Sequence, residues 1–272
     1  MNGPQNALLP DGRLHLHHGP IDLIIGVSGS EKDACYRAAC ARFETVLQGL
    51  AAELPALREP LRGAPFKDPI ARRMARAVCP HAGVFVTPMA AVAGAVADEV
   101  LVAMVAKHAP AKAYVNNGGD IAFHLQGAQT FTALGPAGEI TITSGDPARG
   151  IATSGWGGRS HSRGIADAVT VLAPTAAAAD VAATLIANAV NLPGHPAVTR
   201  VPANTLNPDS DLGARLVTTD VGPLADTDIA TALAHGADVA QKIITQGHIL
   251  QAVLSLQGQV RAITPQGSLT HA

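Results

Sequence analysis

Three short motifs in a fixed order contain the residues of this chain that could do chemistry. The first is Asn-Asn-Gly-Gly-Asp at 116–120, the second is a run rich in Gly, Ser and Arg at 153–164, and the third pairs Asp180 with Thr184. Glycine turns leave backbone N–H groups open to a phosphate, and arginine neutralises its charge. An aspartate beside a hydroxyl suits a hard cation such as Mg²⁺. Together the motifs predict a site for a nucleotide diphosphate with a divalent cation.

The first motif joins two expected strands, so its glycines would form a turn that lets a ligand approach the backbone closely. The two asparagine amides could hydrogen-bond to the edge of a heterocycle. A polar hairpin loop without a ligand is the alternative explanation. The candidate ligand-binding residues are Asn116, Asn117, Gly118, Gly119 and Asp120.

The second motif combines hydroxyls, exposed amide groups and two arginines that can bind phosphate in a bidentate manner. His161 lies between the two arginines and is a candidate catalytic residue. A flexible surface loop is the alternative interpretation. The candidate ligand-binding residues here are Thr153, Ser154, Gly155, Arg159, Ser160 and Arg163.

The third motif lies on an expected helix, where residues four apart share one face. Asp180 and Thr184 are the candidate metal ligands, and Asn188 continues the same face. The alternative is that Asp180 is a carboxylate near a helix N-terminus, where the macrodipole favours negative charge.

The elements that must position these motifs follow from hydrophobic periodicity and turn residues. In the first part of the chain we expect a hairpin over 13–27, one helix over 31–54 with Ser30 as its N-cap, and a helix that Asp68 and Pro69 begin and that ends near 78. A short strand over 84–86 and a long alanine-rich helix over 88–107 follow.

The second part is mostly strands, framed by two further helices. The helices are expected over 176–190 and 226–246, and the segment 191–225 reads as a variable loop insertion rich in Pro, Gly, Asn and Asp. The expected strands are 113–116, 120–125, 130–134, 140–143, 149–153, 168–172, 249–256 and 259–263. Because helices and strands cluster by type, the pattern predicts one α+β domain over 1–272.

Composition narrows the function classes. The net charge of −2 and 3% aromatic residues argue against a general nucleic-acid binder. The apolar stretch 89–106 contains Asp98 and Glu99, so we expect no membrane span, and the N-terminus has no secretory signal pattern. The three cysteines form no zinc pattern and indicate reduced thiols in a cytoplasmic protein. The alanine-rich helices would permit a homodimer.

In these motifs the chain resembles the ApbE superfamily of flavin transferases, and more closely its cytoplasmic ApbE-like branch. The family pattern N-x-G-G-D matches 116–120, its A-T-S-G turn followed by a histidine matches 152–161, and its A-D-A-x-x-T helix after a V-T-V strand matches 169–184. A weaker match is the helix that carries Gly94 and Asp98. The resemblance implies an ApbE-like, T-fold-related architecture in which mixed or antiparallel sheets pack with long helices.

The resemblance also implies a function. Characterised members bind FAD with Mg²⁺ and transfer FMN to a threonine of an acceptor protein, which would make Asp180 and Thr184 metal ligands and Asp180 and His161 catalytic. The chain departs from the family at Ala93, where the family has lysine, and at 161–167, where it lacks His-Ile-Ile-Asp-Pro. The expectation is therefore a protein that binds a flavin nucleotide (FAD or FMN). A non-catalytic nucleotide-binding module and an enzyme for another phosphorylated heterocyclic metabolite remain alternatives.

Overall fold

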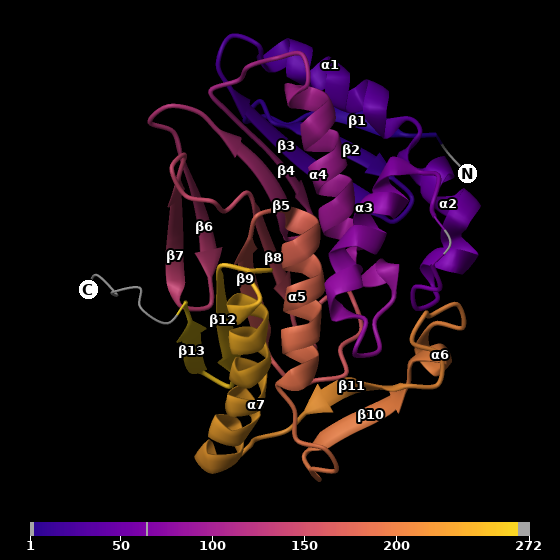
Figure 1. Cartoon of the computed structure of the whole chain (residues 1–272), viewed down its shortest axis with the longest axis vertical. Coiled ribbons are helices and arrows are strands. Elements are labelled where there is room, and N and C mark those ends of the chain that lie inside the picture. Colours follow the sequence, from indigo (N-terminus) through magenta and orange to yellow (C-terminus); the bar gives the residue numbers. More distant parts are fainter. Residues whose placement is uncertain (1–2, 64, 266–272) are drawn as a thin grey trace.

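In the computed structural model, which describes residues 3–63 and 65–265, the motifs are arranged around a nine-stranded sheet (Figure 1). Its strand order is β1-β2-β3-β4-β5-β8-β9-β12-β13, and every neighbouring pair is antiparallel. The strands are β1 (Gln5–Leu8), β2 (Leu14–His18), β3 (Ile21–Ser28), β4 (Lys112–Asn117), β5 (Asp120–Leu125), β8 (Gly150–Ser154), β9 (Ala168–Ala173), β12 (Gln251–Leu256) and β13 (Gln259–Ile263). Antiparallel strands with separate helices confirm the predicted α+β class.

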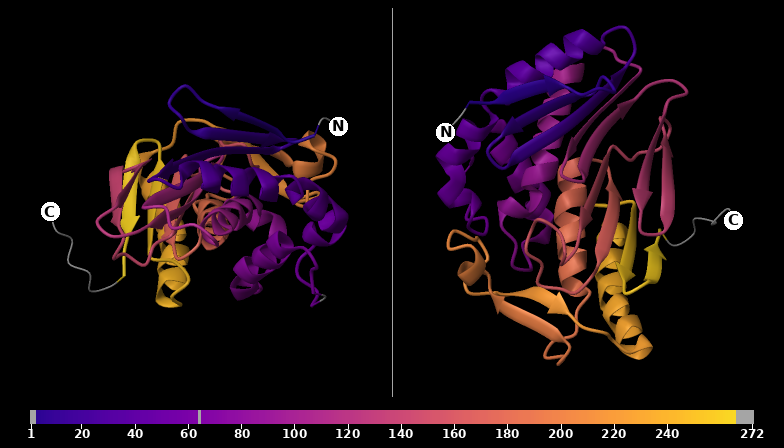
Figure 2. Two further views of the ribbon diagram at one scale, coloured as in Figure 1. Left: turned by 90° about the horizontal axis from the view of Figure 1, so that it is seen from above. Right: turned by 180° about the vertical axis from the view of Figure 1, so that it is seen from behind.

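The long helices cover one face of this sheet, which Figure 2 shows from above and from behind. Helix α4 packs on β4 and β5, α5 on β8 and β9, and α7 on β12. The helices are α1 (Lys32–Phe43), α2 (Val46–Leu57), α3 (Pro69–Val78), α4 (Val92–Val105), α5 (Ala176–Ala189), α6 (Ala203–Leu206) and α7 (Asp226–Thr245), with two 3₁₀ turns, η1 (Cys79–His81) and η2 (Pro88–Ala91).

Small residues bring α4 and α5 into close contact, and this contact places the third motif. A Cβ on Gly94 would lie 2.3 Å from the carbonyl oxygen of Ala176, so only glycine allows this approach. The buried carboxylate of Asp98 accepts hydrogen bonds from the amides of Ala176 and Ala177 at 3.0 Å each. It therefore caps two of the open N–H groups at the start of α5.

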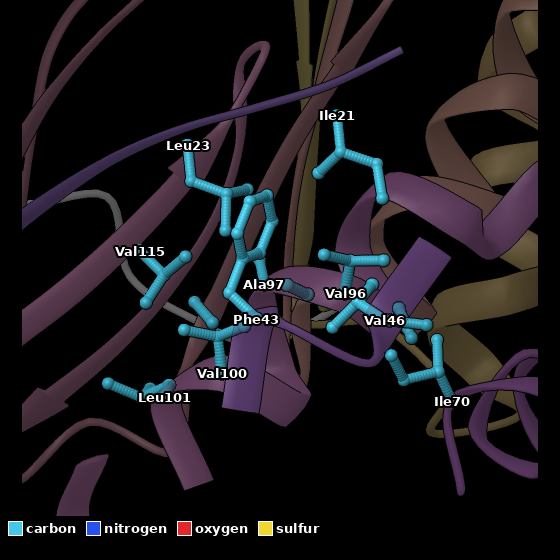
Figure 3. Close-up of a cluster of buried hydrophobic side chains, with 14 of the residues drawn as sticks. Ile21, Leu23, Phe43, Val46, Ile70, Val96, Ala97, Val100, Leu101 and Val115 are labelled. Atoms are coloured by element: carbon cyan, nitrogen blue, oxygen red, sulfur yellow. The ribbon is translucent and has the colours of Figure 1, made fainter. Parts of the chain in front are cut away.

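Apolar side chains from the sheet and the helices form the core beneath the first half of the chain. Figure 3 shows the ring of Phe43 next to Leu23 from β3, with Val100 and Val96 from α4 nearby. These four side chains are buried. This core holds α1, α2 and α4 against the strands that carry the first motif.

Two further strand pairs lie outside the large sheet. One is β6 (Thr130–Gly135) with β7 (Gly138–Thr143), and the other is β10 (Val198–Pro202) with β11 (Leu216–Val221). The second pair lies in the segment predicted as a loop insertion, which therefore contains a strand pair and the short helix α6. The amide of Thr218 on β11 donates to the carbonyl of Ser162 at 2.8 Å, so this pair holds the second motif.

The structure corrects three expectations about elements. The single helix over 31–54 is two helices, because the chain turns at Glu44 and Thr45, and the N-cap is Glu31 instead of Ser30. The residues 84–86 are not a strand, since no neighbour pairs with them. Strand β1 was missed: its side chains are exposed on both faces and show no alternating pattern.

The three cysteines are free, with Cys35 buried, Cys40 partly buried and Cys79 exposed. The segment Pro88–Val105 has the length and hydropathy of a membrane span, but 56% of it is buried inside the fold, as in a core helix. That burial makes the hydropathy weak evidence for a membrane span.

Candidate functional site

The three motifs line two adjoining cavities on the helix-covered side of the large sheet. The first cavity, of about 410 Å³, is largely apolar, and the second, of about 330 Å³, is more polar. Both are lined by Met89, Val92, Ala93, Asp120 and Arg159, so they form one continuous space, which we call the cleft.

The first motif forms the predicted turn between β4 and β5. Gly118 and Gly119 have φ angles of +66° and +110°, which favour glycine. The amide of Gly119 donates to Asn116 Oδ1 at 2.8 Å, and Asn117 Nδ2 donates to the carbonyl of Ala93 at 3.1 Å. The asparagines therefore shape the turn and join it to the start of α4.

The second motif reaches the first through Arg159. Its Nη1 lies 2.8 Å from where a Cβ on Gly118 would be, and its Nη2 donates to the carbonyl of Pro20 at 3.2 Å. Gly155 is needed for packing, because an added Cβ would lie 2.2 Å from the carbonyl oxygen of Asp167. The loop thus has a fixed base and places an arginine over the glycine turn.

The third motif presents its polar residues to the same cleft from α5. Asp180, Thr184 and Asn188 follow one another at intervals of four and all line the polar cavity. Asp180 Oδ2 accepts the amide of Gly94 at 3.0 Å. Asn188 Oδ1 accepts the amide of Arg163 at 2.8 Å, so the last residue of this face also anchors the second motif.

The carboxyl groups of Asp120 and Asp180 line the same cavity, and the charge of Asp180 acts on Asp120. Burial raises the pKa of Asp180 to about 7, against hydrogen bonds from Gly94 and Ala93 that lower it. Burial, and next the charge of Asp180, raise the pKa of Asp120 well above its ordinary value of 3.8. Two neighbouring half-buried carboxyls resist double ionisation, and a cation between them would relieve that cost.

The structure brings many of the predicted site residues together, although not all of them. Those that line the cleft are Asn117, Gly118, Asp120, Ser154, Arg159, Ser160, His161, Asp180 and Thr184. Those that do not line it are Asn116, Gly119, Thr153, Gly155 and Arg163. Thr153 faces away, since its hydroxyl lies 2.8 Å from that of Thr170 on β9.

Several lining residues were missed at the level of sequence. Arg58, at the C-terminal end of α2, lines both cavities and a third one of about 650 Å³ next to them. Residues 209–211, from the segment predicted as an insertion, line the polar cavity, and the Asp211 carboxylate accepts a hydrogen bond from the hydroxyl of Thr87. The leucines of α2, namely Leu47, Leu50, Leu54 and Leu57, form the apolar wall. Their helical spacing was a signal for a buried face, but nothing indicated a ligand.

The donor set of the polar cavity fits a magnesium ion bound together with a ligand phosphate. Within residues 3–63 and 65–265, no group of three or more His, Cys, Asp and Glu side chains could hold a metal alone. Among the four carboxylates that line the cavity, those of Asp120 and Asp180 are nevertheless available together with the hydroxyl of Thr184. Mg²⁺ commonly takes one or two carboxylates and completes its shell with water and substrate phosphate.

Comparisons with known proteins agree with this architecture. The model of the family described as AbpE bacteria matches residues 6–262. The UPF0280 protein MK0206 of Methanopyrus kandleri is 36% identical over 140 residues, which cover 47% of this chain and 51% of that protein. The chain thus aligns with about half the length of this curated relative.

A solved structure supports the same overall fold. The flavin transferase ApbE from Vibrio cholerae has a TM-score of 0.52 at 12% identity and covers 97% of this chain and 98% of its own. The apbe protein from Thermotoga maritima has a TM-score of 0.45 at 12% identity, covering 95% and 97%. At this identity the Vibrio cholerae structure supports the predicted ApbE-like fold and nothing finer.

Proposed function

Because this chain belongs to the AbpE bacteria family, we propose that its cleft binds a flavin nucleotide, FAD or FMN, together with Mg²⁺. One observation carries the proposal: residues of all three motifs, far apart in sequence, line one continuous cleft with an apolar and a polar half. An apolar cavity suits a flat heterocycle, and the polar half suits a pyrophosphate and its cation.

In this proposal Asp180 and Thr184 hold the magnesium ion, and Asp120 lies beside it. The bound ion would neutralise the pyrophosphate and stabilise the AMP leaving group. Arg159 and Arg58 would contact phosphate oxygens from two other sides of the cleft. The partial burial of the two carboxyls supports this arrangement, because a dication would stabilise both ionised groups.

The reaction we propose is transfer of FMN from FAD to a hydroxyl of an acceptor protein. The hydroxyl oxygen bonds to the phosphorus of the FMN half, the bond to the bridging oxygen breaks, and AMP leaves. His161, which is exposed and lines the polar cavity, would accept the hydroxyl proton. With water in place of the acceptor, the same groups would cleave FAD into FMN and AMP.

The binding step is tested by calorimetric titration with FAD, with and without Mg²⁺. We expect saturable binding that Mg²⁺ strengthens and that Asp180→Ala makes independent of Mg²⁺. Asp238→Ala is the control, because that carboxylate is exposed on α7 outside the cleft. Absence of FAD binding by the unaltered protein would refute the proposal.

The catalytic step is tested separately by measuring AMP release from FAD with Mg²⁺ and a threonine-bearing acceptor. AMP release that Asp180→Ala abolishes would support the proposed transfer or cleavage. FAD binding without AMP release would favour a non-catalytic module. Ala93 supports considering that module, since it lines both halves of the cleft where the family resemblance leads one to expect lysine.

A further inference from the structure

A second polar pocket lies at the other end of β4, away from the cleft. It has a volume of about 230 Å³ and is formed by the turn before β2, the end of β3, the start of α1 and the first half of β4. We call it the cationic pocket, and its charged and aromatic residues are Asp11, Arg13, Lys32, Tyr36, Lys112 and Tyr114. Since β4 runs from Lys112 here to Asn117 at the cleft, about five residues of strand at ~3.4 Å each separate the two sites.

The charge of this pocket is unusual for the chain. Three cations, Arg13, Lys32 and Lys112, face one carboxylate, Asp11. Only 15% of the residues are charged, yet two of the five lysines lie here. Like charges that converge in one cavity repel one another, and an anion between them removes that cost.

Each cation is held in place and still has donors to offer. Arg13 Nε donates to Asp11 Oδ2 at 2.7 Å, and Lys112 Nζ donates to the carbonyl of Thr130 at 2.8 Å. Lys32 Nζ lies 5.5 Å from the ring centroid of Tyr36. An ammonium has three N–H donors and a guanidinium five, so every one of these groups can also bind a ligand oxygen.

The two tyrosines of the chain form the aromatic part of the pocket wall. Tyr36 is buried, and its hydroxyl donates to the carbonyl of Gly12 at 3.0 Å. The ring of Tyr114 lies against Gly26, where an added Cβ would be 2.3 Å from a ring carbon. The Tyr114 hydroxyl oxygen lies 2.8 Å from that same Cβ position, so it too is next to Gly26, which lines the pocket together with Arg13.

We propose that the cationic pocket binds a phosphate group, either as inorganic phosphate or as the phosphate of a small phosphomonoester. Its volume of about 230 Å³ admits such a group together with a few waters. The cations supply charge-assisted hydrogen bonds to the phosphate oxygens, and Tyr114 supplies a hydroxyl. This site does not depend on the function proposed for the cleft.

The two tyrosines provide a direct test, because the chain has no others. Replacing them with 3-fluorotyrosine gives two ¹⁹F resonances that both report on the cationic pocket. Titration with inorganic phosphate at constant ionic strength should shift the Tyr114 resonance saturably, and sodium chloride should not. A parallel titration with glycerol phosphate determines whether the free ion or the ester binds more tightly.

Variants locate the effect in the pocket. Lys112→Gln and Lys32→Gln should each weaken phosphate binding by about tenfold or more, the usual effect of losing a charge-assisted hydrogen bond. Lys107→Gln, an exposed lysine outside the pocket, and Arg159→Gln in the cleft should leave it unchanged. The proposal is wrong if neither phosphate probe gives a saturable shift, if chloride gives the same shift, or if Lys107→Gln weakens binding as much as Lys112→Gln.

Discussion

Replacing Asp180 by asparagine should stabilise the ligand-free protein at alkaline pH and have little effect at acid pH. The reason is the raised pKa of about 7 for this carboxyl, which burial causes. Asparagine removes the charge, and its side-chain oxygen can still accept the hydrogen bond from Gly94. The substitution therefore isolates the electrostatic cost of the carboxylate from the structural bond that it makes.

The magnitude follows from the difference between the folded pKa of about 7 and the ordinary value of 3.8. At about 1.36 kcal/mol per pKa unit, this difference of roughly three units sets a ceiling of about 4 kcal/mol. Because the Asp180 side chain is partly exposed, solvent screening should reduce the effect to about 1–3 kcal/mol. The folded state binds more protons, so this stability is fully present below pH ~4 and is lost as the pH rises through about 7.

The assay is urea unfolding of the metal-free protein and the variant at pH 4 and pH 8, followed by circular dichroism. At pH 4 the two free energies of unfolding should agree within about 1 kcal/mol, and at pH 8 the variant should be more stable. Asp238→Asn is the control, with a change of about 0.5 kcal/mol or less at either pH. An equal difference between Asp180→Asn and the unaltered protein at both pH values would refute the electrostatic reasoning.

Three other substitutions test how the cleft is built, and unfolding and flavin-binding measurements check them. Asp98→Ala leaves the first amides of α5 without an acceptor and should cost about 2–4 kcal/mol of stability, so a loss below about 1 kcal/mol would contradict the capping role. Gly94→Ala places a methyl group 2.3 Å from a carbonyl oxygen of α5 and should cost about 1–3 kcal/mol, whereas Gly157→Ala, which meets open space, should be nearly neutral. Arg58→Gln should weaken FAD binding about tenfold but leave riboflavin binding unchanged, because riboflavin has no phosphate. The control is Arg62→Gln, since the Arg62 side chain is 80% exposed and ion-paired. Equal weakening of the binding of both ligands would exclude a phosphate contact.

The sequence predicted those elements whose ends require particular residues, namely glycine at positive φ angles or a side chain that caps the helix. The turn at 116–120 was predictable because two adjacent glycines take positive φ angles there. The start of α3 was predictable because Asp68 accepts the amides of Ile70 and Ala71, while Pro69 occupies a position that needs no N–H donor.

Tertiary packing decided the elements that were missed. Helix α2 continues through Pro55 to Leu57, and the complete burial of Leu57 offsets the cost of a proline inside a helix. Strand β1 is an edge strand with exposed side chains, so backbone pairing with β2 alone defines it. The residue pattern within each segment does not indicate such contacts with other segments.

The candidate site likewise has one part that local signals predict and one part that tertiary packing determines. The residue types of the three motifs indicated phosphate and cation chemistry, but the placement of Asp180 near Asp120 depends on α5 packing against α4 through Gly94. Arg58 belongs to none of the three motifs. Only the packing of α2 over the cleft brings it to the place where the three cavities adjoin. The arrangement of these charged residues in the cleft therefore depends on contacts between segments and cannot be predicted from any one segment. Asp120 and Asp180 repel each other when both are ionised, and a cleft that keeps this repulsion in its empty state gains the most from binding a cation.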